Sequence, residues 1–151
     1  MKNLFQPERV AEVKSRLATL RPDSRAEWGK MTVTQMVAHC SVGIESATGD
    51  RQIKRVPIGY LLGPLVRGLA LGDDKPMKKN SPTARDFIIS GEGDLDSERS
   101  RLTELIDKFA SGGPAKCTTY PHAFFGKLSA EQWAILMYKH LDHHLRQFGV
   151  P

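Results

Sequence analysis

Histidines are the residues of this chain whose type and spacing best suit chemistry. Of the five, three occur together near the C-terminus, at His140, His143 and His144. On a helix, His140 and His144 would lie about 40° apart and one turn along, on the same face. Metal–nitrogen bonds of about 2.0–2.1 Å require ligand atoms roughly 3 Å apart, which this spacing supplies. An apolar stripe predicts that both rings point into a core; it comprises Trp133, Leu136, Met137, Leu141 and Phe148.

The other histidines could complete or surround such a site. His39 occurs on an earlier amphipathic segment, from which a helical bundle would bring it opposite His140 and His144 as the third ligand. His143 would lie about 60° to the other side of His140, and we expect it at the rim of the site or in solvent. His122 stands close to two phenylalanines on a predicted loop, so we expect it at a pocket mouth or on the surface.

Two other interpretations of the histidine pair compete with a metal site. A single inward-facing histidine is commonly a hydrogen-bonded core residue, but two buried imidazoles without a shared partner would cost desolvation twice. The pair also has the spacing of the zincin helix, in which a glutamate directly follows the first histidine. Leu141 stands at that position, which excludes a metalloprotease of this type.

Four predicted helices must position these side chains. They run from Pro7 to Leu20, from Thr32 to Gly49, from about Asp96 to Ala110, and from Ser129 to Phe148. Capping boxes begin the second and the fourth, where Gln35 and Gln132 follow the first residue by three positions. The sequence therefore predicts a single all-α domain over residues 1–151. We expect a four-helix bundle with a long irregular or short-helical excursion between the second and third helices.

The excursion contains the longest apolar stretch of the chain. Val56–Leu71 is interrupted by Arg67, two prolines and three glycines, and it is shorter than the about 20 residues of a membrane helix. We expect a short helix around Ile58–Leu71, broken or bent at Gly63-Pro64. Its apolar side chains predict packing over the bundle or across a homodimer interface. Asp86–Ser90 is a candidate for a short strand.

Composition excludes several classes of protein. The 151 residues carry 22 lysines and arginines against 17 aspartates and glutamates, and 40% of them are hydrophobic. This balance excludes a disordered chain, a collagen-like repeat and a disulfide-stapled miniprotein. Two distant cysteines and the lack of an apolar leader predict a reduced, cytoplasmic protein without membrane contact.

Positive charge is concentrated in the excursion. Eight lysines and arginines lie between Arg51 and Arg85, together with only two aspartates. Such a segment could meet nucleic acid, but it matches no nucleic-acid-binding motif and carries few aromatic residues. A solvated loop is therefore favoured over nucleic-acid binding.

A family resemblance rests on motifs at both ends of the predicted bundle. They are His39, the pattern His140-x-x-His143-His144-x-x-Gln147, the segment Trp28-Gly29-Lys30-Met31-Thr32, Phe125-Gly126 and Trp133. With these motifs the chain resembles the DinB/YfiT-like superfamily of metalloenzymes, and within it an uncharacterised bacterial branch. The element order agrees over nearly the whole chain, whereas the specific motifs cover residues 28–44 and 121–149.

The resemblance implies a four-helix bundle that holds a divalent metal ion, zinc or nickel, through His39, His140 and His144. Some relatives are transferases that act with a low-molecular-weight thiol, so a small-molecule substrate and such a thiol are the expected partners. Three imidazoles leave a coordination position open, where a thiol could bind as thiolate or a water could act as nucleophile. Gln147 is expected to support His144 or to contact the substrate.

A general base is harder to find in the sequence. Asp142 is expected to face away from His140, and Glu45 lies one residue off its apolar stripe. Thiol transfer needs no separate base, because a metal ion lowers the pKa of the thiol. A metal-dependent thiol transferase is therefore the favoured function. The alternatives are a metal-dependent hydrolase and a metal-binding bundle without catalysis.

Overall fold

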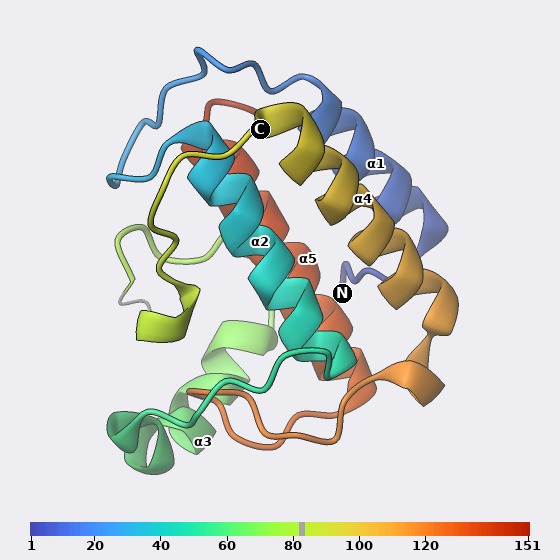
Figure 1. The fold of residues 1–151 in the computed structure, drawn as a ribbon. Helices are drawn as coiled ribbons and strands as arrows, with labels where there is room; N and C mark the ends of the chain where they lie inside the picture. The colour runs from blue at the N-terminus through green and yellow to red at the C-terminus, as the bar shows by residue number, and fades with distance from the viewer. Residues whose placement is uncertain (82–83) are drawn as a thin grey trace.

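The structure is a computed structural model that describes residues 1–81 and 84–151. Within these residues the secondary structure consists of five α-helices and two short 3₁₀ helices, without a strand (Figure 1). The helices are α1 (Pro7–Ala18), α2 (Val33–Thr48), α3 (Pro57–Leu71), α4 (Leu95–Gly112) and α5 (Ala130–Gln147), with η1 (Arg85–Phe87) and η2 (Pro114–Lys116) between them. The predicted all-α class is confirmed.

Local sequence signals account for the ends of the two helices that carry the candidate site. Thr32 and Ser129 are the N-caps of α2 and α5, and each forms the predicted capping box with the glutamine three residues later. In these boxes the hydroxyl accepts the backbone N–H of the glutamine, and the glutamine side chain accepts the backbone N–H of the cap. Gly49 ends α2 with a φ of 86°, a left-handed conformation that favours glycine.

Four of the helices pack around one apolar core. α2 contacts α4 and α5, and α1 contacts the same two helices. Figure 1 shows α2 and α5 side by side, with α1 and α4 as a second pair next to them. The largest buried side chains of the core come from these helices and the N-terminal segment; they include Leu4, Leu17, Met36, Leu102, Ile106, Trp133 and Leu145. This core holds α2 and α5 together and so fixes the relative positions of their histidines.

Two local predictions for the excursion are corrected by the structure. Of the break or bend expected at Gly63-Pro64, the break is absent, because α3 is one continuous helix through Pro64. Proline removes one backbone donor but leaves the rest of the helix intact, and Pro64 lies on the exposed side, where water can solvate the freed carbonyl. The strand expected at Asp86–Ser90 is also wrong: Arg85–Phe87 forms η1, which packs against α2 instead of pairing with another strand.

α3 docks on the bundle through small residues. Gly59 and Gly63 are buried against the backbone of Phe124, and a Cβ at Gly63 would lie only 2.0 Å from the Phe124 carbonyl oxygen. The long apolar side chains point the other way, so of the two expected arrangements, burial in the bundle is wrong for most of them, and packing across a homodimer interface stays a prediction. Leu65 and Leu69 are 73% and 81% exposed.

A buried lysine joins α3 to α5. Lys139 is 7% exposed, and its ammonium donates to the carbonyl oxygens of Ala70 and Asp73 at 2.7 and 2.9 Å. These carbonyls lie at the C-terminal end of α3, where a positive charge is favoured by the helix dipole. The contact anchors the excursion one residue before His140.

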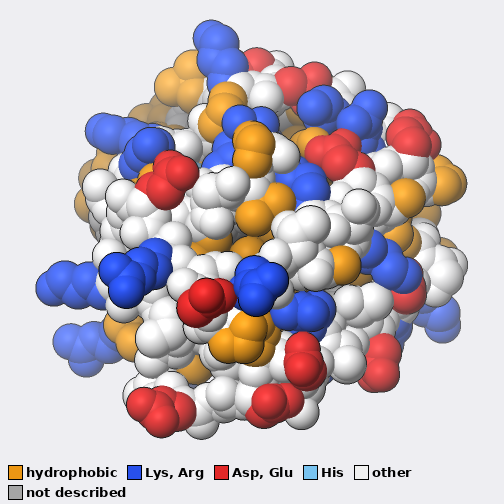
Figure 2. Space-filling model, turned by 90° about the horizontal axis from the view of Figure 1, so that it is seen from above, with side chains coloured by type: hydrophobic (Ala, Val, Ile, Leu, Met, Phe, Trp, Pro, Cys, Tyr) orange, Lys and Arg blue, Asp and Glu red, His pale blue; other side chains and the backbone are white. Residues whose placement is uncertain are grey.

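The remaining surface is mixed in character. Figure 2 shows lysine and arginine side chains interspersed with aspartate and glutamate on the face seen from above. Cys40 and Cys117 are both free, and Cys40 is buried. Within the described residues, none of the helices has the length and apolar character needed to cross a membrane.

Candidate metal centre

Three histidines from two helices meet in the interior of the bundle. α2 contributes His39, and α5 contributes His140 and His144. The Nε2 atom of His140 lies 2.9 Å from that of His39 and 3.2 Å from that of His144. One ligand atom from each residue lies within 4.8 Å of the other two. The structure therefore brings together the three residues that the sequence selected, which we call the histidine triad.

Hydrogen bonds on the far side of two rings determine where their protons lie. His39 Nδ1 is 2.9 Å from the carbonyl oxygen of Phe87. A carbonyl only accepts, so Nδ1 carries the proton and Nε2 presents its lone pair to the triad.

The second ring is fixed through a side-chain amide. His144 Nδ1 is 2.8 Å from Gln147 Oε1, and Gln147 Nε2 donates to the carbonyl oxygen of Trp28 at 2.6 Å. The Trp28 carbonyl determines which end of the amide is the donor, so Oε1 accepts from His144 Nδ1. His144 therefore also presents a lone pair from Nε2. Gln147 supports His144 in this way, one of the two roles expected for it.

Burial keeps the triad neutral. Desolvation is the main cause that lowers the pKa of all three rings, to about 3 for His144 and well below the ordinary value for His140. The nearby imidazoles add to the effect, because a second positive charge at this distance would be repelled. Neutral imidazole is the form of histidine that binds a metal ion.

Glycines provide the space that the rings and their supports occupy. A Cβ at Gly43 of α2 would lie 3.0 Å from His140 Nδ1 and 3.2 Å from its Cε1. A Cβ at Gly29 would lie 2.5 Å from Gln147 Nε2, and Gly29 has a φ of 82°. His140 Nδ1 is buried and has no hydrogen-bond partner among the described residues.

The triad is open on one side, toward a cavity of about 370 Å³ that we call the inner cavity. His39 and His144 contribute to its wall, whereas His140 is not among its lining residues. Its other lining residues come from the α1–α2 connection, the excursion and the end of α5; they are Trp28, Gly29, Lys30, Met31, Asn80, Ser81, Phe87, Ile88, Ile89, His143 and Gln147. A small molecule in the inner cavity would therefore reach the triad.

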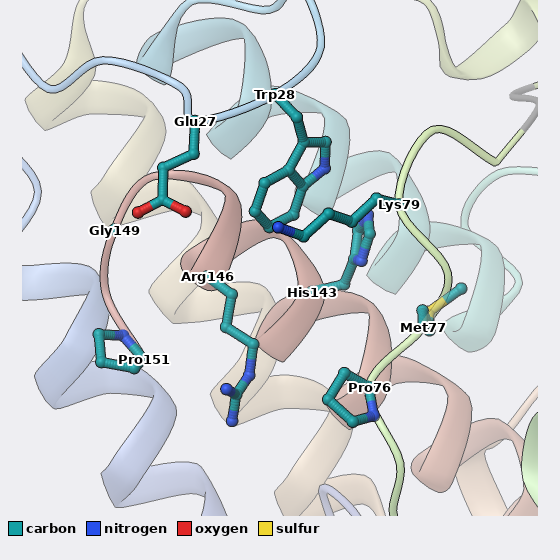
Figure 3. A pocket seen from close by; sticks show the side chains of 9 residues that line it. All are labelled: Glu27, Trp28, Pro76, Met77, Lys79, His143, Arg146, Gly149 and Pro151. Atoms are coloured by element: carbon teal, nitrogen blue, oxygen red, sulfur yellow. The ribbon is translucent and has the colours of Figure 1, made fainter.

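A second cavity of about 410 Å³, the outer cavity, adjoins the first. Figure 3 shows its lining residues, which are Glu27, Trp28, Pro76, Met77, Lys79, His143, Arg146, Gly149 and Pro151. Trp28 and His143 line both cavities. The His143 ring lies 5.6 Å from that of Trp28 and 5.1 Å from that of His144, between centroids. His143 thus lies at the rim, one of the two positions expected for it, and it is not part of the triad.

His122 has a different environment from the one expected. Its Nδ1 accepts the backbone N–H groups of Phe124 and Phe125, both at 3.1 Å, and its ring stacks on Phe125 and contacts Trp133. Burial lowers its pKa to about 4. His122 is not among the residues that line either cavity. It organises the loop that receives α3.

The two carboxylates considered as bases are both held by arginines. Asp142 accepts from Arg16 at 2.9 Å and from Arg146 at 2.8 Å. Glu45 pairs with Arg51 and Arg101. Neither lines the inner cavity.

Sequence reasoning missed part of the site. Phe87 supplies a backbone carbonyl to His39, a role that leaves no trace in the type of side chain. Trp28 belongs to the motifs that carry the family resemblance, but nothing in the sequence indicates that its side chain lines two cavities. Lys79 belongs to the basic segment, where nothing in the spacing distinguishes it from its neighbours.

Comparison with known proteins places the chain in a family. No curated protein and no solved structure matches it. A family model described as "Protein of unknown function (DUF1569)" matches residues 4–150, nearly the full length of the chain. The chain therefore belongs to the DUF1569 family.

Proposed function

We propose that the histidine triad binds a divalent metal ion, zinc or nickel, and that the protein is a metal-dependent transferase acting with a low-molecular-weight thiol. The sequence motifs that resemble the DinB/YfiT-like superfamily imply the same three ligands and so agree with this proposal. The observation that carries it is the convergence of His39 and His144 lone pairs on the Nε2 atom of His140.

Without an ion, the ring nitrogens of the histidine triad cannot all find hydrogen-bond partners. Two lone pairs face His140 Nε2, which can carry one proton and make one good hydrogen bond. The site is buried, so the other lone pair would stay desolvated at a cost of about 1–3 kcal/mol. A metal ion would accept a lone pair from each of the three rings, with His140 in the Nδ1–H form.

The spacing also suits a metal ion. Tetrahedral bonds of about 2.0–2.1 Å place neighbouring ligand atoms roughly 3.3 Å apart. The two Nε2 separations of 2.9 and 3.2 Å are close to that value. The hydrogen bonds to Phe87 and Gln147 are of the kind that orients metal-binding histidines.

The chemistry of the surroundings favours a thiol over an activated water. A bound divalent ion would lower the pKa of a thiol and favour its thiolate form. Among the described residues the inner cavity has no carboxylate in its lining to serve as a general base. The chain's own residues would bind and orient the substrate: Trp28 and Phe87 offer apolar walls, and Gln147 keeps His144 in place.

Metal analysis of protein purified without a histidine tag tests the proposal. His39→Ala, His140→Ala and His144→Ala should each lose most of the metal, whereas His143→Ala should keep it. His143→Ala is the matched control because it removes a neighbouring imidazole on the same helix. Stoichiometric metal in all three triad variants would overturn the assignment.

Thiol binding tests the second half of the proposal. Calorimetry of the metal-loaded protein in two buffers of different ionisation enthalpy should show binding of a small thiol with proton release, absent in His140→Ala. Failure of thiols to bind, together with turnover of an ester substrate, would favour the hydrolase instead. Metal without either activity would identify a non-catalytic metal-binding bundle.

A further inference from the structure

The inner cavity differs from the rest of the surface in its charge. Among the described residues its lining contains one lysine, Lys30, together with the uncharged polar side chains of Asn80, Ser81 and Gln147, but no aspartate or glutamate. The charged group of the inner cavity is therefore a cation.

A second lysine lies where the two cavities meet. Lys79 Nζ lies 4.1 Å from the centroid of the Trp28 ring. Figure 3 shows its side chain extended from the excursion toward Trp28, beside the His143 ring. Cation–π attraction to tryptophan holds an ammonium in such a position. Because Trp28 lines both cavities, Lys79 stands at the boundary of the inner cavity.

Neither lysine is neutralised by a carboxylate. Within the described parts of the chain, no acidic group lies within 4.0 Å of the Lys30 or Lys79 ammonium. Arg146, which lines the outer cavity, differs in this respect, because its Nε pairs with Asp142 at 2.8 Å. Lys30 and Lys79 are thus positioned to attract an anion into the inner cavity.

The remaining walls set the character of the rest of the ligand. Trp28, Met31, Phe87 and Ile89 make much of the lining apolar. A cavity of about 370 Å³ is within the range of small-molecule sites, which combine apolar walls with a few polar groups that fix orientation. Two rings of the triad, His39 and His144, form part of its wall.

We propose that the substrate is a small organic anion. Its anionic group lies against Lys30 and Lys79, its apolar part lies against Trp28 and Phe87, and its reactive end reaches the open side of the triad. This inference rests on the proposed metal centre and adds the substrate class to it. It does not depend on whether the reactive end is a thiol.

A pair of probes that differ only in charge tests the inference. The monohydroxamate of glutaric acid carries a metal-binding head and a distal carboxylate, and its terminal amide carries the same head and a neutral tail. Calorimetry of the metal-loaded protein should show about tenfold tighter binding of the acid than of the amide. Metal content is measured on the same samples.

Two double variants assign the effect to particular lysines. Lys30→Gln/Lys79→Gln should bring the ratio of the two affinities close to one while metal content stays unchanged. The matched control is Lys54→Gln/Lys127→Gln, which removes the same net charge from exposed lysines outside both cavities and should keep the ratio.

Each other result has a distinct meaning. Equal affinity of the two probes for the unmodified protein would overturn the inference and leave the metal centre standing. An equal loss of the ratio in both double variants would show general electrostatic attraction and would also overturn it. Failure of both probes to bind fully metal-loaded protein would show that the cavity does not lead to the ion, and it would overturn the inference. Absence of metal would overturn the proposed function, and this inference with it.

Discussion

Replacement of Gly43 by alanine tests the geometry of the triad without removing a ligand. The added methyl group would lie 3.0 Å from Nδ1 and 3.2 Å from Cε1 of His140. Ordinary contact between such atoms begins at about 3.5 Å, so the ring must retreat from α2 by roughly 0.5 Å. We therefore expect Gly43→Ala to misplace His140 Nε2 relative to its two partners.

The size of the effect follows from the tolerance of metal sites. Ligand distances in metal centres are held within about 0.2 Å, so the displacement exceeds what an ion accommodates easily. Loss of support for a ligand costs roughly 10–100-fold in metal affinity. We expect a fall of about tenfold in Gly43→Ala, equivalent to about 1.4 kcal/mol. The free energy of unfolding of the metal-free protein should change little, because alanine gains about 1 kcal/mol of helix propensity against the strain.

Competition with a chromophoric zinc chelator would measure the affinity, and thermal unfolding would confirm that the variant folds. Gly68→Ala is the matched control, because Gly68 lies in α3 with nothing within 4 Å of the added methyl group. It gains the same intrinsic helix propensity and should bind metal as the unmodified protein does. Unchanged affinity in a folded Gly43→Ala protein would refute the reasoning, since His140 would then not be the tightly confined ligand described.

Two further predictions concern stability. Between about pH 6.5 and 4 the unfolded chain protonates His122 while the folded chain keeps it neutral, so falling pH should remove up to about 3 kcal/mol of stability. His122→Asn keeps an acceptor for the same two amides but cannot titrate, so its denaturant midpoint should fall less steeply over this range; parallel profiles would contradict the assignment. Lys139→Met should leave the carbonyls of Ala70 and Asp73 without their donor and loosen α3, which faster amide exchange confined to α3 would reveal. An equal increase in amide exchange throughout the protein would contradict the role of Lys139 as an anchor.

Local signals in the sequence determined much of the architecture. Capping boxes at Thr32 and Ser129 mark the starts of the two site-bearing helices, because a cap involves residues only three positions apart. The i, i+4 spacing of His140 and His144 brings both rings to one face for the same reason. The two rings share one environment because of helical periodicity, which can be applied to the sequence without knowledge of the tertiary structure.

Contacts between distant segments required the tertiary structure. His39 faces the pair only because the core packs α2 on α5, and its proton is placed by the Phe87 carbonyl, 48 residues away. The helix continues through Pro64 without the break that was one of the two alternatives predicted there. Gly59 and Gly63 dock on the Phe124 backbone and leave most leucines of α3 outside the bundle, so that packing across a homodimer interface stays a prediction. Side-chain type and spacing indicate the secondary structure of one segment and which of its faces is buried. Which backbone group or charge meets it is decided by packing, and so the cavity, its lysines and the hydrogen bonds that orient the triad appear only in the folded chain.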